Sequence, residues 1–215
     1  MPNSRLGPGE HHVHEGQARI CTQRARDRHD RIIVTEKLDG ANVAIANIGG
    51  RLTAIGRAGY PADTAPQEHI RLFGQWVASD RNRWLDLLRP GEVLHGEWLA
   101  LAHGTRYDLP HEPFVAFDLT IDGGRCSWDE LQSRSSAQEF VTPKVVSDGP
   151  PATIEEICRV IDRVSGHGVI APDLVEGAVW RVERRGSFDF MAKWVRPEKV
   201  DGKYFDSPIW LWRPY

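Results

Sequence analysis

The sequence predicts one α+β domain in which antiparallel β-sheets are flanked by a few helices. Short apolar runs with strand character recur along the 215 residues, and the turn at Gly49-Gly50 is short enough to join two of them as a hairpin. Few stretches have helical periodicity, and no internal repeat or linker divides the chain. Many strands joined by hairpins, with few helices between them, are typical of this fold class.

The expected strands are runs in which apolar residues alternate with polar ones or follow one another directly. They cover residues 31–37, 41–48, 51–57, 93–99, 114–119, 139–146, 177–182 and 188–195. Short connections between several successive runs favour antiparallel pairing, because parallel neighbours need longer crossovers.

Three stretches are expected to be helical, at residues 66–88, 127–134 and 153–164. The first carries an apolar stripe at helical spacing, with a break near Ser79-Asp80. The second begins with Ser127 and has Glu130 three positions on, which is a capping-box signature. Thr153 is the expected cap of the third helix.

The composition limits the class of protein. A net charge of −3 argues against a generally basic nucleic-acid coat, although it allows a local basic groove. The three cysteines are scattered and odd in number, which argues against a disulfide framework and against a zinc site. No apolar run approaches the ~20 residues of a membrane span, and the start of the chain does not resemble a signal peptide. We therefore expect a cytoplasmic protein that has no membrane partner.

Two stretches near the start of the chain are expected to lie outside the core. Residues 1–12 are rich in Gly, Pro and polar groups, so we expect them to be loose. Residues 21–31 alternate Arg with Asp, a pattern that we interpret as a solvated charged connection.

The tetrapeptide Lys37-Leu38-Asp39-Gly40 lies between the first two expected strands. Lysine is rare in this chain: of 27 basic residues, five are lysines and the others are arginines. Arginine does not lose its proton, whereas a deprotonated lysine amine can act as a nucleophile. From the tetrapeptide alone, a surface lysine in a hairpin turn explains the motif as well as a nucleophile does.

Other short motifs follow in a fixed order, and each one alone has an ordinary structural explanation. They are Gly56-Arg57, Gly96-Glu97-Trp98, Phe117-Asp118, Glu176-Gly177-Ala178-Val179 and Ala192-Lys193-Trp194. Together with the tetrapeptide, this order resembles the covalent nucleotidyltransferase superfamily of ATP-dependent ligases and capping enzymes.

Within that superfamily the chain is most similar to RNA ligases of the phage T4 Rnl2-like branch, over roughly residues 31–200. The matching residues are Glu36 before the lysine, Asn42 five positions after it and Arg57 twenty positions after it. The stretch His103-Gly104-Thr105-Arg106-Tyr107-Asp108-Leu109-Pro110 also matches. The last motif departs from the family pattern, because it holds one lysine where a K-x-K pair is frequent, and Arg196 follows in a different register.

The resemblance implies a nucleotidyltransferase (ATP-grasp-like) core of antiparallel sheets flanked by helices. It implies an ATP-dependent RNA ligase that uses Mg2+ or Mn2+. Such an enzyme forms a lysyl-AMP intermediate, transfers AMP to an RNA 5′-phosphate and seals this end to a 3′-hydroxyl. Its partner would be RNA with those two ends, and a protein partner is possible.

The resemblance also assigns roles to individual residues. The catalytic set would be Lys37, Asn42, Arg57, Glu176 and Lys193. Glu176 would hold a metal ion through water, and Asn42 would act at the sealing step.

Several residues would bind the nucleotide. Glu97 would contact the ribose hydroxyls, and Phe117 and Val179 would enclose the adenine between them. Arg57 and Lys193 would bind phosphate, and Glu36 and Lys37 complete the nucleotide-binding set.

Two alternatives remain open. The chain could be a module that recognises or adenylylates RNA ends without sealing them alone, or a DNA ligase or capping-type nucleotidyltransferase. The residues after Lys193 are too few for an OB-fold domain. We therefore expect residues 1–215 to form a single nucleotidyltransferase domain. The intact Lys37, Glu97, Glu176 and Lys193 favour an enzyme over a pure binding module.

Overall fold

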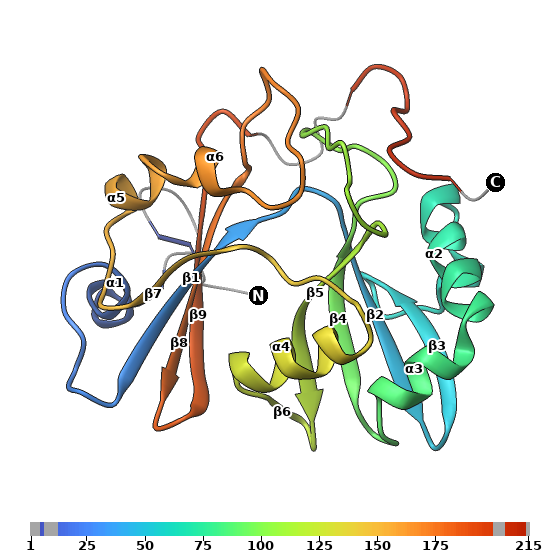
Figure 1. Ribbon diagram of the computed structural model, residues 1–215, viewed down its shortest axis with the longest axis horizontal. Helices are drawn as coiled ribbons and strands as arrows, with labels where there is room; N and C mark the ends of the chain where they lie inside the picture. The colour runs from blue at the N-terminus through green and yellow to red at the C-terminus, as the bar shows by residue number, and fades with distance from the viewer. Residues whose placement is uncertain (1–4, 7–12, 200–204, 214–215) are drawn as a thin grey trace. The chain divides into compact units, whose positions relative to one another are not determined.

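The computed structural model describes residues 5–6, 13–199 and 205–213. The chain folds into two compact units, each built around one antiparallel sheet (Figure 1). Unit 1 comprises Met1–Leu38, Gly104–Asp108 and Pro143–Lys203, and unit 2 comprises Asp39–His103, Leu109–Thr142 and Tyr204–Tyr215.

Unit 1 contains a four-stranded sheet in the order β7-β1-β8-β9, in which every neighbouring pair is antiparallel. Its strands are β1 (Asp30–Lys37), β7 (Val145–Gly149), β8 (Gly177–Arg184) and β9 (Ser187–Val195). Its helices are α1 (Glu15–Thr22), α5 (Ile154–Cys158) and α6 (Ile161–Val164).

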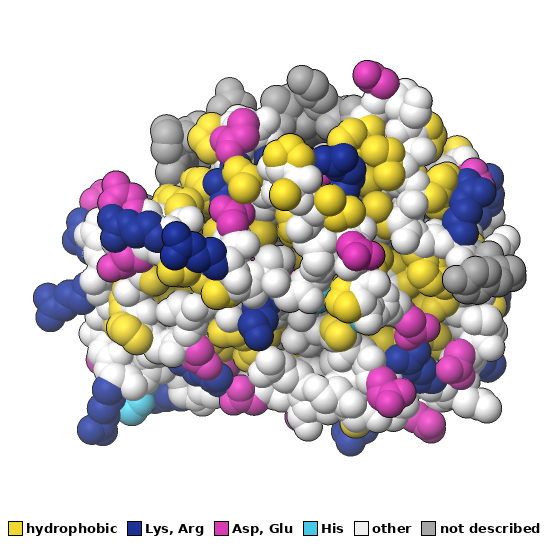
Figure 2. Space-filling view, turned by 45° about the horizontal axis from the view of Figure 1, so that its top comes forward, with side chains coloured by type: hydrophobic (Ala, Val, Ile, Leu, Met, Phe, Trp, Pro, Cys, Tyr) yellow, Lys and Arg dark blue, Asp and Glu magenta, His cyan; other side chains and the backbone are white. Residues whose placement is uncertain are grey.

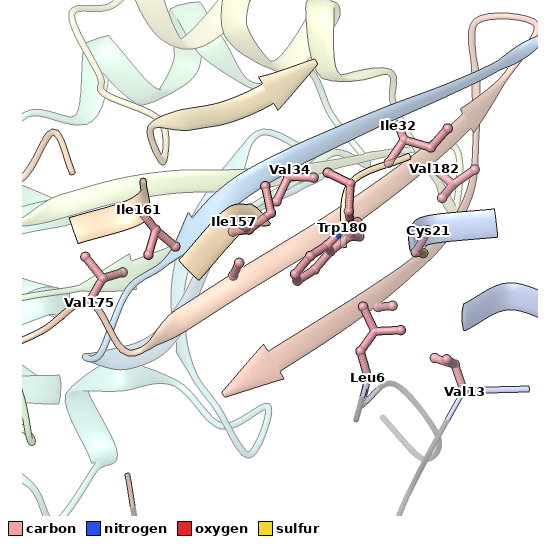
Figure 3. Packing of buried hydrophobic residues seen from close by; sticks show 13 residues of the cluster. Leu6, Val13, Cys21, Ile32, Val34, Ile157, Ile161, Val175, Trp180 and Val182 are labelled. Carbon is pink, nitrogen blue, oxygen red and sulfur yellow. The ribbon is translucent and has the colours of Figure 1, made fainter. Parts of the chain in front are cut away.

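One face of this sheet forms an apolar core around Trp180, which is fully buried (Figure 3). Ile32 and Val34 of β1 belong to the same cluster, as does Val182 of β8. The three helices add Cys21, Ile157 and Ile161. Side chains alternate between the faces of a strand, so this core fixes which residues of β1 and β8 lie on the opposite face.

Unit 2 contains a five-stranded antiparallel sheet in the order β3-β2-β4-β5-β6. Its strands are β2 (Ala41–Ile48), β3 (Arg51–Gly56), β4 (Val93–Trp98), β5 (Phe114–Ile121) and β6 (Gly124–Arg125). Its helices are η1 (Ala62–Thr64), α2 (Glu68–Ser79), α3 (Arg81–Leu87) and α4 (Trp128–Ala137).

The core of unit 2 is largely aromatic. Trp84 of α3 stacks on Phe140 with a centroid separation of 4.4 Å, and Phe73 of α2 lies 5.3 Å from Trp98 of β4. The predicted break between the two helices is confirmed at Asp80, whose side chain accepts a hydrogen bond from the backbone N–H of Arg83.

The strand expected over residues 139–146 is wrong in its position. Glu139 has a left-handed backbone with φ of 58°, and Val141 forms an isolated bridge with Val115, so the regular strand β7 begins at Val145. Pro143 lies within the expected strand and has no N–H to donate to a ladder. The helix expected over 153–164 is divided into α5 and α6, and helix α1 was not expected.

The charged stretch over residues 21–31 is largely exposed, as predicted, and it also forms an ion-pair network. The carboxylate of Asp30 is fully buried and bonds to Arg26 and to Arg184 of β8. Arg184 also pairs with Asp27 at 2.6 Å, and Arg26 pairs with Asp189 at 2.5 Å. These long-range pairs fix the entry to β1 against β8 and β9.

Of residues 1–12, which the sequence predicts to be loose, the structure describes Arg5 and Leu6, and the others lie outside the described residues. Leu6 is buried, and its N–H donates to the carbonyl oxygen of Lys193 at 2.7 Å. Within the described parts of the chain, every helix is too short or too polar to span a bilayer.

Candidate active site

Lys37 is the last residue of β1, and its ammonium lies 2.5 Å from a carboxylate oxygen of Glu176. The side chains of Lys37 and Glu176 are 23% and 10% exposed, so the pair is shielded but reachable. Lys37 is in register with Gly177, the first residue of β8, so Glu176 enters the sheet directly beside the end of β1. The structure therefore brings together the lysine of the first motif and the acid of the fifth.

Strand register places further predicted residues on the same face of the unit 1 sheet as Lys37. Thr35 pairs with Val179 of β8, and Val179 pairs with Lys193 of β9. Directly paired residues point to the same face, as do residues two apart in a strand. Lys37, Val179 and Lys193 consequently share the face opposite the Trp180 core.

Glu36 lies on the other face of β1. Its side chain is fully buried, and one carboxylate oxygen accepts a hydrogen bond from the N–H of Lys144 at 2.9 Å. The same oxygen lies 3.0 Å from Nε2 of His167 and 3.4 Å from the N–H of Gly166. Burial raises the pKa of Glu36, but the neighbouring His167 and the hydrogen bond from the Lys144 N–H hold it below its ordinary value. The structure thus does not bring the Glu36 carboxylate to the Lys37 amine.

Two features hold Glu176 in place. A side chain at Gly177 would overlap the carbonyl oxygen of Trp194 and would come within 3.0 Å of the Val195 Cα, so β9 approaches this glycine closely. Arg196 donates from its backbone N–H to the Glu176 carbonyl at 2.9 Å and from Nε to the Val175 carbonyl at 2.8 Å. The Arg196 guanidinium also pairs with Asp162 at 2.5 Å, so this arginine braces the segment behind Glu176.

In unit 2, Asn42 of β2 is directly paired with Glu97 of β4, and their side chains lie on one face. The Glu97 carboxylate accepts a hydrogen bond from the N–H of Gly40 at 3.0 Å. A Cβ atom at Gly40 would lie 2.7 Å from the Trp98 carbonyl oxygen, so the close approach of these two strands requires a glycine. Glu97 therefore anchors the end of the tetrapeptide, directly before β2.

Arg57 follows β3 and lines, together with Asn42, a cavity of about 810 Å³ within unit 2. His69 and His103 line the same cavity, with their ring centroids 5.7 Å apart. Burial, together with the neighbouring His103, lowers the pKa of His69 to about 4, so that this imidazole is neutral at pH 7. The cavity thus presents the Arg57 guanidinium, the carboxylate of Asp206 and the neutral imidazole of His69.

Phe117 lies in β5 at an irregularity of the β4–β5 pairing. Gly96 pairs with Ala116, whereas His95 pairs with Asp118, so Phe117 is the additional residue of a β-bulge. Phe117 is half-buried, while its neighbours Ala116 and Asp118 are buried. A bulge re-aims the side chain that it contains, which is consistent with a functional position.

The predicted site residues divide between the two units. Unit 1 holds Glu36, Lys37, Glu176, Val179 and Lys193. Unit 2 holds Asn42, Arg57, Glu97 and Phe117. The boundary falls between Leu38 and Asp39, so the tetrapeptide contributes to both units.

Sequence reasoning missed His167, which contacts Glu36, and the ion pair between Arg106 and Asp173. Arg106 belongs to the family-like stretch, and its Nε and Nη2 donate to the two Asp173 oxygens at 2.8 and 3.0 Å. The sequence Gly166-His167-Gly168 carried no signal, since a single histidine between glycines fits no motif.

The described side chains offer a divalent cation few protein ligands. No group of three or more His, Cys, Asp or Glu side chains suited to a metal ion occurs among residues 5–6, 13–199 and 205–213. Magnesium usually keeps several waters and takes one or two carboxylates plus substrate phosphates, instead of a cage made by the protein alone. The largely shielded carboxylate of Glu176 fits an ion held in this way.

The surface in view carries both signs of charge. Figure 2 shows Lys and Arg side chains interspersed with Asp and Glu, without one continuous basic field on this face. Contacts to a polyanion on this face would therefore come from individual cations and not from a broad positive potential.

A family model described as RNA ligase matches residues 30–195. No curated protein matches the chain in sequence. Among solved structures, the chain is similar to an archaeal ATP-dependent RNA ligase, with 21% identity and a TM-score of 0.53 over 77% of this chain and 42% of that one.

It is also similar to a mutant of the Naegleria gruberi RNA ligase solved with ATP and Mn, with 18% identity and a TM-score of 0.58 over 83% of this chain and 53% of that one. A putative ATP-dependent DNA ligase from Aquifex aeolicus has 18% identity and a TM-score of 0.50 over 77% of this chain and 43% of its own. At such identities the likeness shows a shared fold, which confirms the predicted nucleotidyltransferase architecture. The chain spans about half the length of these proteins.

Proposed function

The chain belongs to the RNA ligase family, and from this premise we propose that it is an ATP-dependent RNA ligase of the phage T4 Rnl2-like branch that works through a lysyl-AMP intermediate. The observation that carries the proposal is the position of Lys37. Its ammonium ends β1 beside the Glu176 carboxylate, at 2.5 Å, on the face that also bears Val179 and Lys193. A lysine that is largely shielded from solvent and lies beside a proton acceptor is suited to nucleophilic attack.

In the proposed first step, the Lys37 amine attacks the α-phosphorus of ATP. An ammonium has no lone pair, so Nζ must first lose a proton, and the Glu176 carboxylate is close enough to accept it. The bond from Nζ to the α-phosphorus forms as the bond from that phosphorus to the bridging oxygen breaks. Pyrophosphate leaves with the electron pair, the second Nζ proton passes to solvent, and AMP remains on the lysine as a phosphoramidate.

We assign a nucleotide contact to each of four further residues. Lys193 binds the α-phosphate, and Val179, which is directly paired with it, contacts the adenine. Phe117 provides the other apolar contact to the base, which adds roughly 0.5–1.5 kcal/mol beyond burial. Glu97 binds the ribose hydroxyls.

In the second and third steps, the RNA ends react. An oxygen of the RNA 5′-phosphate attacks the α-phosphorus, the bond to Lys37 breaks, and the amine recovers a proton. The 3′-hydroxyl oxygen then attacks the RNA phosphorus, AMP leaves, and the hydroxyl proton passes to solvent. Asn42, which lines the unit 2 cavity, would place the 3′ end, and Arg57, which lines the same cavity, would bind a phosphate.

Glu176 would hold Mg2+ or Mn2+ through water. When bound, the cation offsets the charge of the phosphates and assists the departure of pyrophosphate. The structure of the Naegleria gruberi RNA ligase mutant, which was solved with ATP and Mn, supports the choice of metal.

The test is to follow labelled AMP from ATP onto the protein and then onto RNA. Incubation with ATP labelled at the α-phosphate and Mg2+ should place one AMP on Lys37, as peptide mapping would show. Lys37→Arg should abolish this label, because guanidinium keeps the charge but is not a nucleophile. Lys144→Arg, at an exposed position, is the matched control and should label normally.

Addition of 5′-phosphorylated RNA with a 3′-hydroxyl strand on a complementary template should transfer the label and then yield sealed product. Label on RNA without sealing would identify an end-adenylylating module instead of a ligase. Equal labelling with GTP would favour capping chemistry, and labelling of a residue other than Lys37 would contradict the proposal.

A further inference from the structure

We propose that Glu36 and His167 form a buried pair in direct contact that positions Lys37 for attack, and that Glu36 acts through the backbone and not by contacting the nucleotide. This inference rests on the proposed function, because it concerns the adenylylation of Lys37. It assigns a role to His167 and replaces the direct nucleotide contact that the family resemblance implied for Glu36.

The first argument is the direction of the Glu36 side chain. Residues two apart in a strand point to the same face, and Glu36 lies two residues after Val34 and pairs directly with Ala178. Both Val34 and Ala178 belong to the apolar core, so the Glu36 side chain lies on the core face and not on the face of Lys37. The side chains of Glu36 and His167 are 0% and 4% exposed. A group that is enclosed in this way has no access to a ligand on the Lys37 face.

The second argument is what the carboxylate holds together. One oxygen of Glu36 contacts the N–H of Lys144, the N–H of Gly166 and the imidazole of His167. The backbone N–H of Glu36 in turn donates to the Lys144 carbonyl at 3.0 Å. A single residue of β1 thus fastens two other chain segments at the position immediately before the nucleophile.

The third argument is that the fastened loop leads to Glu176. Gly168 is held by the N–H of Asp108, which donates to the Gly168 carbonyl at 2.7 Å, and its left-handed φ of 70° favours glycine. Further along, the Val175 N–H donates to Asp162 at 3.1 Å. The pair of Glu36 and His167 therefore fixes the start of the loop whose end supplies the carboxylate beside Lys37.

The energetics require a partner for Glu36. An ionised carboxylate in a buried position is costly unless charged or hydrogen-bonding groups surround it. Removal of His167 takes away a side chain in direct contact with this carboxylate, so the local backbone must rearrange or the carboxylate must take up a proton. A displacement of about 1 Å at a reacting group can cost on the order of 100-fold in rate.

The test compares Glu36→Gln, His167→Gln, His167→Leu and the double variant Glu36→Gln/His167→Gln in single-turnover adenylylation of Lys37 over a range of ATP concentrations. We expect the rate constant to fall roughly 10- to 100-fold in Glu36→Gln and His167→Leu, while the apparent KM for ATP stays within about twofold. His167→Gln keeps a hydrogen-bond donor and should lose less than His167→Leu. The double variant should be no slower than Glu36→Gln, because both residues act as one unit.

The matched control is Glu183→Gln. Glu183 is another fully buried carboxylate of the same sheet, paired with Arg181 at 2.8 Å, and it is in register with Arg31 near the opposite end of β1. This variant should lose stability, yet label Lys37 at the normal rate when all proteins are assayed well below their melting temperatures.

Three results would overturn the inference. The first is wild-type rates in the His167 variants. The second is a raised KM for ATP in Glu36→Gln with an unaffected His167→Leu, which would indicate a direct nucleotide contact. The third is an equal loss in Glu183→Gln, which would indicate general destabilisation. Failure of the proposed function is distinguishable from all three, because the wild-type protein would then not form lysyl-AMP.

Discussion

Substitution of Gly177 by alanine tests whether the close approach of β9 to β8 sets the geometry at Glu176. The new Cβ would overlap the Trp194 carbonyl oxygen and would lie 3.0 Å from both the Trp194 carbonyl carbon and the Val195 Cα. These atoms are backbone, so no side-chain rotation relieves the overlap. Strand β9 must move away from β8, or Gly177 must move away from β9.

The expected cost follows from these contacts. Insertion of a methyl group into a packed site costs typically 1–3 kcal/mol, and a rigid backbone obstacle places Gly177→Ala at the upper end, about 3 kcal/mol. The lower entropy of the unfolded alanine chain offsets about 0.4–1 kcal/mol. The net loss of about 2 kcal/mol corresponds to a melting temperature lower by roughly 4–8 °C for a protein of this size. Because Glu176 is displaced from Lys37, adenylylation should slow about tenfold or more.

The matched control is Gly16→Ala in helix α1, where an added Cβ meets no atom within 4 Å of its position among the described residues. Alanine is the better helix former, so this control should gain about 0.5 kcal/mol and keep its activity. Denaturation curves and single-turnover labelling with ATP measure both effects. A Gly177→Ala protein with wild-type stability and labelling would refute the reasoning.

Three further outcomes are expected. Asn42→Ala should slow sealing of pre-adenylylated RNA by on the order of 100-fold and largely spare Lys37 labelling, because a single oriented contact at the sealing step is lost; parallel loss of both steps would contradict this. Burial lowers the pKa of His69 to about 4, so the unfolded state binds a proton at this imidazole more readily than the folded state does. The free energy of unfolding should therefore fall by up to about 3 kcal/mol as the pH drops from about 6.5 towards 4. Melting curves against pH should show a smaller fall for His69→Gln. Burial raises the pKa of Cys21 to about 12, so iodoacetamide at pH 8 should alkylate Cys126 in the folded protein and Cys21 only on unfolding; early labelling of Cys21, read by mass spectrometry, would count against this.

Sequence patterns predicted the helices and strands whose positions depend on residues close to them in the chain. The two strands around the tetrapeptide were predicted within one residue, because their apolar runs are continuous, and the break at Asp80 followed from a capping residue. The strand expected over 139–146 was misplaced because the left-handed backbone at Glu139 leaves no pattern in a single sequence. Helix α1 escaped notice because Cys21 is its one buried residue, so it lacks an apolar stripe.

The candidate site likewise combines residues that the motif order predicts with residues that only the tertiary structure brings together. Motif order placed Lys37 and Glu176 in one site, and the structure joins them at 2.5 Å. The family resemblance also placed Glu36 with the nucleotide-binding residues, although strand alternation directs adjacent side chains to opposite faces. His167 was beyond reach, because its contact with Glu36 depends on the packing of a loop that is distant in sequence. Such contacts are settled by tertiary structure and leave no periodic trace.

The hydrogen bond from Leu6 to Lys193 has a consequence for self-association. Strand β9 is the last strand in its sheet, and an uncovered edge strand is a template for pairing with another chain. Arg5 and Leu6 pair with that edge at Lys193 in parallel orientation. The Lys193 carbonyl oxygen therefore already accepts a hydrogen bond and is not open to a second copy of the protein. A protein that lacks residues 1–6 would present this edge, and light scattering should then detect aggregation at concentrations at which the full chain remains monodisperse.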